Sequence, residues 1–112
     1  MANPKFEIQK STDDQHYWNL IAGNGEKILT SERYTTRSSA VNAIESVKTN
    51  AVDDERYDKR TASTGRQHYF ALLAANGQVL GTSEMYDSKS ARDGGIEAVK
   101  RNAAEAEVEV EG

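Results

Sequence analysis

The chain has 112 residues, a mass of 12.3 kDa and no cysteine, which excludes disulfides, zinc–thiolate sites and a thiol nucleophile. No apolar run is long enough for a membrane span or a signal peptide, so we expect a cytoplasmic protein. Its 18 acidic and 14 basic residues give a net charge of −4, which disfavours nucleic acid as a partner.

The first three predicted elements are strands. Residues 5–11 place apolar side chains two positions apart, as expected for a strand with one buried face. A second strand follows at residues 16–22 and a third at residues 26–31. Between these two, Asn24-Gly25 predicts a type I′ hairpin turn, because both residue types tolerate positive φ.

A helix is predicted after the third strand. Thr35 or Thr36 suits its N-cap, because a threonine hydroxyl accepts a hydrogen bond from a backbone N–H of the first turn. Apolar residues then recur at spacings of four, three and four, which indicates one face packed on a core. This stripe consists of Ala40, Ile44, Val47 and Ala51.

The second half of the chain repeats the first at an offset of 52 residues. Residues 16–51 and 68–103 share 17 identities in 36 positions, whereas chance gives roughly two or three. Two halves of about fifty residues are each marginal alone. We therefore expect one domain, residues 1–112, made of repeats at about 5–54 and 55–112 that pack about a pseudo-two-fold axis.

The second helix differs from the first in its glycines. Asp87 is its expected N-cap, and its apolar stripe is Ile96, Val99 and Ala103. Gly94 and Gly95 lie in the middle, where each is about 1 kcal/mol less favourable than alanine. A close approach to the sheet or to the other helix would explain them.

Strands are also predicted after both helices. The tail at residues 106–112, AEVEVEG, alternates acidic and apolar side chains, which is typical of a strand. One continuous strand near residues 55–62 is expected to end the first repeat and open the second. By symmetry, the N-terminal and C-terminal strands should then lie close together.

Motifs in both repeats resemble the YegP-like family of small uncharacterised bacterial proteins. The resemblance covers residues 5–108 and rests on KFEIQK, the Asn-Gly hairpins, LTSERY, GTSEMY, IESVKTNA and IEAVKRNA. It implies an α+β fold of two β-β-β-α-β units in one antiparallel-rich sheet, with two helices on one face and exchanged C-terminal strands. It implies no established activity. The family tends to have Asn-Gly before the helix isoleucine; here Asn42-Ala43 leaves open whether the first repeat makes the contact that this glycine permits.

Histidines recur at equivalent positions, where they open the second strand of each repeat. His16 and His68 suit either a symmetric acid–base or metal pair, or two half-exposed strand histidines. The spacings His-x-x-His and His-x-Glu are both missing from the sequence, so we expect no metal site and no cofactor.

A Ser-Glu pair leaves the third strand of each repeat. Ser31-Glu32 and Ser83-Glu84 are candidates for nucleophilic chemistry, but the chain has no G-x-S-x-G elbow and no S-x-x-K motif. The alternative is that serine and glutamate cap the turn that leads into the helix.

The sheet face that points away from the helices is the main candidate for binding. If the helices cover Trp18 and its neighbours, the opposite face carries the candidate residues Tyr17, Asn19, Ile21, Tyr69 and Leu73. Such residues form either a binding platform or an ordinary surface that self-associates. Lys27 and Arg66 are the nearest basic residues, which is little for a nucleic-acid platform.

These observations favour a non-enzymatic binding or interaction module with an unknown partner. The alternatives are a small enzyme that uses the His16/His68 or Ser-Glu pairs, and a nucleic-acid-binding protein. We expect a monomer with pseudo-dimer symmetry, because each repeat completes the sheet of the other.

Overall fold

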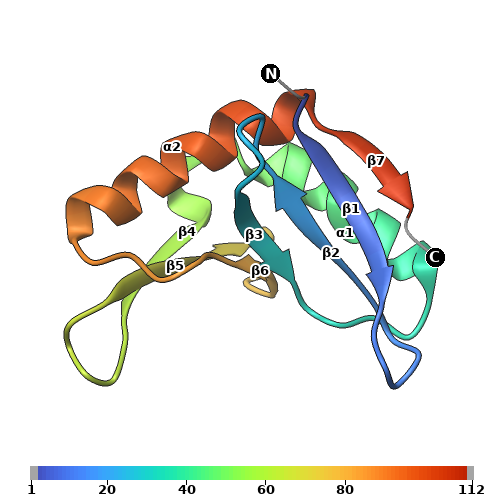
Figure 1. The fold of residues 1–112 in the computed structure, drawn as a ribbon, viewed down its shortest axis with the longest axis horizontal. Coiled ribbons are helices and arrows are strands. Elements are labelled where there is room, and N and C mark those ends of the chain that lie inside the picture. Colours follow the sequence, from blue (N-terminus) through green and yellow to red (C-terminus); the bar gives the residue numbers. More distant parts are fainter. Residues whose placement is uncertain (1–2, 111–112) are drawn as a thin grey trace.

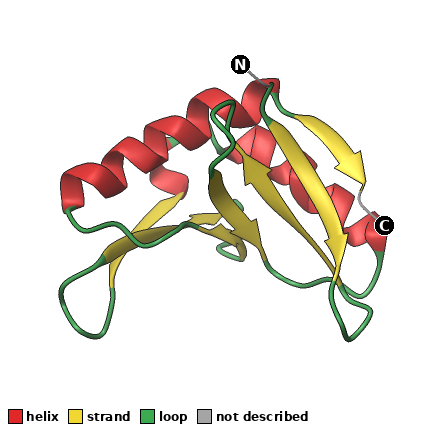
Figure 2. Cartoon of the chain, viewed as in Figure 1, coloured by secondary structure: helices red, strands yellow, loops and turns green. Residues whose placement is uncertain are grey.

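The computed structural model describes residues 3–110, so residues 1–2 of the expected domain and 111–112 of the expected tail strand lie outside it. Two helices lie on one side of a mixed seven-stranded sheet (Figures 1 and 2), which confirms the α+β class and the two tandem β-β-β-α-β repeats. The elements in chain order are β1 (Lys5–Lys10), β2 (His16–Ile21), β3 (Lys27–Ser31), α1 (Arg37–Asn50), the short 3-10 helix η1 (Asp54–Arg56), β4 (Tyr57–Thr61), β5 (His68–Leu73), β6 (Val79–Thr82), α2 (Lys89–Glu105) and β7 (Glu107–Val110).

The repeats meet at the centre of the sheet. The strand order is β4-β5-β6-β3-β2-β1-β7, so the third strands of the two repeats, β3 and β6, are neighbours. They pair antiparallel, with Thr30 opposite Thr82. Because these two threonines are equivalent in the repeat, the pseudo-two-fold axis passes between them.

Each helix carries the chain to the edge of the other repeat. Helix α1 leads to β4, which pairs with β5, and α2 leads to β7, which pairs in parallel with β1 (Figure 1). The N-terminal and C-terminal strands therefore lie side by side, as expected. The expected continuous strand at 55–62 is wrong at its start. The Asp53 side chain accepts a hydrogen bond from the Glu55 N–H and caps η1, so β4 begins only at Tyr57.

The Asn-Gly turns differ from the prediction. In the first turn Gly25, and not Asn24, has a positive φ, of 89°, and the Gly25 N–H donates to the Ala22 carbonyl at 2.9 Å. The turn is therefore a three-residue loop with a glycine bulge rather than a type I′ turn. Asn24 contributes through its side chain, whose Oδ1 accepts a hydrogen bond from the Glu26 N–H. Asn76 and Gly77 repeat this arrangement in the second half.

Both helices begin at a hydroxyl side chain. The Thr36 hydroxyl accepts from the Ser39 N–H, as predicted. The second N-cap is Ser88 rather than Asp87, because Ser88 has the extended backbone of a cap and its hydroxyl accepts from the Ala91 N–H.

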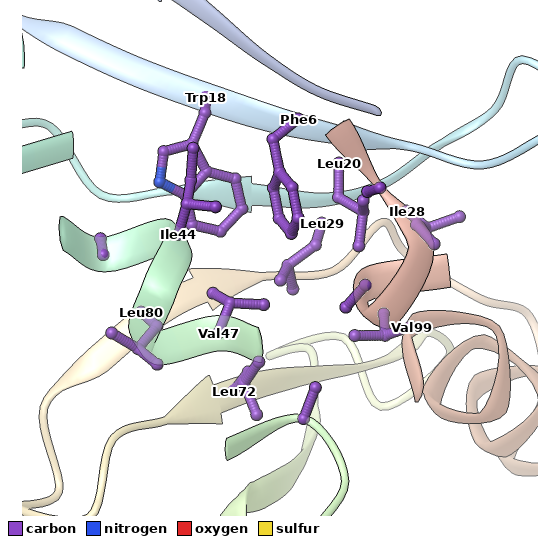
Figure 3. Close-up of a cluster of buried hydrophobic side chains, with 14 of the residues drawn as sticks. Phe6, Trp18, Leu20, Ile28, Leu29, Ile44, Val47, Leu72, Leu80 and Val99 are labelled. Carbon is purple, nitrogen blue, oxygen red and sulfur yellow. The ribbon is translucent and has the colours of Figure 1, made fainter. Parts of the chain in front are cut away.

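The core lies between the helices and the sheet (Figure 3). Trp18 is fully buried and packs edge-on against Phe6, at 5.2 Å between ring centroids. Both predicted helix stripes are buried in this core. Near the pseudo-two-fold axis, equivalent positions of the two repeats carry side chains of different size, namely Leu29 and Gly81. A Cβ built on Gly81 would lie 2.9 Å from Cγ of Leu29. Leu29 therefore occupies space that a leucine at position 81 would also need, and glycine at this position avoids the clash.

Candidate functional site

A row of mostly small or polar side chains crosses the sheet face that points away from the helices, which we call the open face. The strand register places its members opposite one another, in the order Glu7, Asn19, Thr30, Thr82, Ala71 and Asp58. The centre of the open face is thus built by both repeats.

Asn19 does not offer its amide to the solvent. Its relative exposure is 3%, and its Oδ1 accepts a hydrogen bond from the Thr30 hydroxyl at 2.7 Å. The expectation that Asn19 lies on an exposed surface is therefore wrong. Its equivalent, Ala71, is also fully buried. Both side chains are short and lie on interior strands of the sheet.

The two tyrosines of the open face are half-buried, and the structure places an arginine beside each. The Arg33 guanidinium lies 4.8 Å from the ring centroid of Tyr17, whose hydroxyl donates to Gln9 Oε1 at 2.8 Å. Arg60 lies directly opposite Tyr69 in the register of β4 and β5. Asp58 and, to a smaller extent, Tyr69 raise the pKa of Arg60.

The two aliphatic candidates lie elsewhere. Ile21 and Leu73 are half-buried at the far ends of β2 and β5, where both ladders shift register. Ile21 is four residues from Tyr17, which corresponds to about 13 Å along a strand. The predicted surface is therefore not one continuous apolar patch.

Ser31 and Ser83 have structural roles. The Ser31 hydroxyl accepts from the Trp18 N–H at 2.9 Å and donates to the Glu32 carbonyl at 2.7 Å. Ser83 makes the same two bonds with Phe70 and Glu84. Each hydroxyl thus completes the ladder where the strand ends, and its proton is already engaged.

The glutamates that follow these serines are exposed. Each lies two residues before a tyrosine of the same repeat, Tyr34 or Tyr86. Burial raises the pKa of Tyr34, and the nearby Glu32 carboxylate raises it further. Glu84 acts in the same way on Tyr86. The Ser-Glu motif therefore brings a carboxylate to the surface beside a half-buried phenol.

The histidines do not form a common site. The His16 backbone bridges to Tyr34 with N···O distances of 2.6 and 2.8 Å, and His68 bridges to Tyr86. Their strands, β2 and β5, are three positions apart in the sheet, or about 14 Å. Among residues 3–110, no group of three or more His, Asp or Glu side chains is placed to hold a metal. No helix in the described part of the chain is long and apolar enough to cross a bilayer.

Sequence reasoning missed Arg33, Arg60 and Gln9, which surround the two tyrosines. The strand register alone predicts that Arg60 faces Tyr69, once the hairpin loop is known. The sequence gives no such signal for Arg33. This residue lies between the end of β3 at Ser31 and the isolated bridge of Tyr34 to His16, where the regular strand register is interrupted.

The chain is similar over most of its length to proteins of unknown function. A family model described as "Domain of unknown function (DUF1508)" matches twice, at residues 11–58 and 63–109. UPF0339 protein YegP of Escherichia coli K12 is 52% identical over 97 residues, and a UPF0339 protein of Shewanella oneidensis is 53% identical over 97; each match covers 87% of both chains.

Solved structures agree with this relationship. The solution NMR structure of yegP from Escherichia coli has a TM-score of 0.91 at 46% identity, and the match covers 98% of this chain and 94% of that one. A UPF0339 protein structure from Shewanella oneidensis has a TM-score of 0.89 at 47% identity, covering 96% and 91%. The chain belongs to the YegP-like (UPF0339) family of uncharacterised proteins, with two tandem DUF1508 repeats.

Proposed function

We propose that the protein is a non-enzymatic interaction module, a cytoplasmic monomer that binds a partner protein through its open face. One observation carries the proposal. Tyr17 and Tyr69 occupy equivalent positions of the two repeats, both are half-buried, and each lies beside an arginine. The fold does not use these rings in its core, whereas tyrosine and arginine are the residue types enriched where protein interfaces are most sensitive to substitution.

The charges of the open face favour a protein over a nucleic acid. Lys5 forms ion pairs with Glu7 and Glu109, and Arg60 forms one with Asp58 at 2.9 Å. Both of these cations are therefore paired with carboxylates on the same face. A nucleic-acid surface presents mainly positive charge to the phosphates, while a protein interface accommodates both signs.

An enzymatic function has less support from the geometry. The Ser31 and Ser83 hydroxyls are engaged in the ladder, and His16 and His68 lie on strands three positions apart. A nucleophile requires a base within hydrogen-bond reach, and no hydrogen bond joins either serine to a histidine in residues 3–110.

Site-specific photo-crosslinking tests the proposal. A photoreactive phenylalanine analogue replaces Tyr17 or Tyr69, and Thr49 on the exposed side of α1 provides the control position. We expect the same partner to crosslink from both sheet positions and not from the control. The purified partner should then bind a Tyr17→Ser/Tyr69→Ser variant at least tenfold more weakly than the wild type, with a Thr49→Ala variant unchanged. Equal crosslinking from Thr49, no adduct from the tyrosine positions, or an unchanged affinity of the double variant would contradict the proposal.

A further inference from the structure

The two edges of the sheet differ in how they meet the solvent. At the β4 edge, Lys59 points to the helix side and pairs with Asp93 of α2 at 3.3 Å. An inward-pointing charge of this kind discourages the addition of another strand. At the β7 edge the residues that point to the helix side are Val108 and Val110, which are 42% and 47% exposed. The second edge is therefore the one that offers apolar surface to a further strand.

The backbone of β7 is also available on its outer side. β7 pairs in parallel with β1, and the Glu107 N–H donates to the Pro4 carbonyl at 3.3 Å. In a parallel ladder, alternate residues point their backbone groups to opposite sides. The N–H and C=O groups of Val108 and Val110 therefore point away from β1, where no strand follows in the described part of the chain.

The inner partner of β7 shows which chemistry this strand accepts. In β1, Phe6 and Ile8 lie opposite Val108 and Val110, so apolar residues meet the valines. On the other face the Lys5 ammonium lies 3.5 Å from Glu109 Oε1. A strand that satisfies β7 thus brings apolar side chains to its helix-side face and a cation to its glutamates.

A second copy of this chain does not meet these requirements. Antiparallel pairing of two β7 strands that brings valine to valine also brings glutamate opposite glutamate, which is destabilising. The β4 edge of a second copy would bring Lys59 to the valine face, and on the glutamate face its cation, Arg60, is already paired with Asp58 at 2.9 Å. The occupant must therefore come from another protein.

We propose that the outer edge of β7 binds an extended segment of a partner protein in which Lys or Arg alternates with Val, Ile or Phe. Such a segment adds an eighth strand to the sheet, with its backbone paired to β7, its apolar residues on Val108 and Val110, and its cations near Glu107 and Glu109. This site is separate from the tyrosines of the open face, so it stands or falls independently of the proposed function.

Peptide titration of the full chain, followed by backbone amide NMR, tests this inference. The probe is the peptide KVKVKVK, and KKVVVKK is the control of identical composition and charge. We expect saturable shifts centred on the amides of residues 107–110 with the alternating peptide and at least tenfold weaker binding of the control. Equal binding of the two peptides, shifts spread over acidic groups elsewhere, or no binding would overturn the inference.

A matched pair of charge reversals separates strand addition from general attraction. Glu107→Lys changes a residue of β7, whereas Glu105→Lys makes the same change in charge on the last turn of α2. Both side chains are exposed, so neither variant should disturb the fold. We expect Glu107→Lys to weaken KVKVKVK binding at least fivefold more than Glu105→Lys does. Equal losses would show that the peptide only follows the net charge of the chain.

Discussion

Two adjacent glycines of α2 should respond in opposite ways to the same substitution. Gly94 is exposed, and a Cβ built on it meets no other atom within 4 Å. Gly95 is buried, and a Cβ built on it would lie 2.3 Å from the Tyr86 hydroxyl oxygen and 2.6 Å from Cζ of that ring. A close approach therefore exists at Gly95 and not at Gly94, and its partner is the Tyr86 ring, from the segment before α2, rather than the expected sheet strand or other helix.

The expected free energies follow from these contacts. Gly94→Ala gains helix propensity without a clash and should stabilise the protein by about 0.5–1 kcal/mol. Gly95→Ala makes the same gain but forces the Tyr86 ring to move, and overpacking typically costs about 1–3 kcal/mol. The two variants should therefore differ by about 1–3 kcal/mol in their free energy of unfolding. Because both replace glycine in the same helix, their effects on the unfolded chain are nearly equal and cancel in this difference.

Urea unfolding, followed by circular dichroism, measures this difference. A second pair of variants locates its cause, since Tyr86→Ala removes the ring that the new methyl group meets. In the Tyr86→Ala background, Gly95→Ala should become stabilising, as in a double-mutant cycle between contacting residues. A clash with the Tyr86 ring would be refuted if Gly95→Ala stabilises the wild-type protein as much as Gly94→Ala does, or if removal of Tyr86 leaves the effect of Gly95→Ala unchanged.

Three further predictions concern the core, the pH dependence of stability and the solution state. Trp18→Ala should lower the free energy of unfolding by about 3–5 kcal/mol, because the indole is fully buried. His16→Gln should change it by no more than about 0.5 kcal/mol, since only the His16 backbone bridges to Tyr34, and equal losses in urea unfolding would contradict the assigned strand faces. Burial raises the pKa of Tyr57, with Asp54 and Glu97 adding to the effect, and its hydroxyl donates to the Ala51 carbonyl at 2.7 Å. The folded state therefore keeps this proton at a pH where the unfolded chain has lost it. The free energy of unfolding should fall as pH rises above about 10, by up to about 1.4 kcal/mol per pH unit for this group. The slope should be shallower in Tyr57→Phe, and an unchanged slope would exclude Tyr57 as its source. Light scattering behind a sizing column should give the monomer mass of 12.3 kDa, and a doubled mass that returns to the monomer value in Tyr17→Ser/Tyr69→Ser would instead identify the open face as a dimer interface.

Side-chain periodicity was sufficient to predict the strands and helices, because the repeat supplied each element twice, whereas their assembly into one sheet with exchanged strands was implied by the family resemblance. Alternation predicted the three strands before each helix, and the apolar stripes predicted the faces that α1 and α2 bury. Details that depend on which of two suitable residues acts were not predictable. Asp87 and Ser88 can both cap a helix, and the cap is Ser88 because its backbone is the extended one.

The candidate site was predicted less well, because it depends on where side chains settle after the sheet has formed. Tyr17 and Tyr69 were identified from strand alternation alone. Their arginine neighbours were not, since Arg33 reaches Tyr17 only after β3 leaves the ladder. The burial of Asn19 follows from its place on an interior strand beside Thr30, a property of the assembled sheet rather than of its own strand.

Both proposals above depend on the domain organisation, since the open face and the β7 edge need strands from both repeats. We propose that the repeats form one cooperative unit. Trp18 is the sole tryptophan and reports on the first repeat, and Phe70 occupies the equivalent buried position of the second. A Trp18→Phe/Phe70→Trp variant therefore moves the same fluorophore to the other repeat.

Equilibrium unfolding in urea of both proteins, each followed by tryptophan fluorescence and by far-ultraviolet circular dichroism, tests this claim most directly. Fluorescence reports on one repeat and circular dichroism on the whole chain, so one cooperative unit requires the two curves to coincide in each protein. We expect a single shared midpoint and slope for both probes in the wild type and again in the swapped variant. A fluorescence midpoint that departs from the circular dichroism midpoint in either protein would show that the repeats unfold separately and would contradict the account.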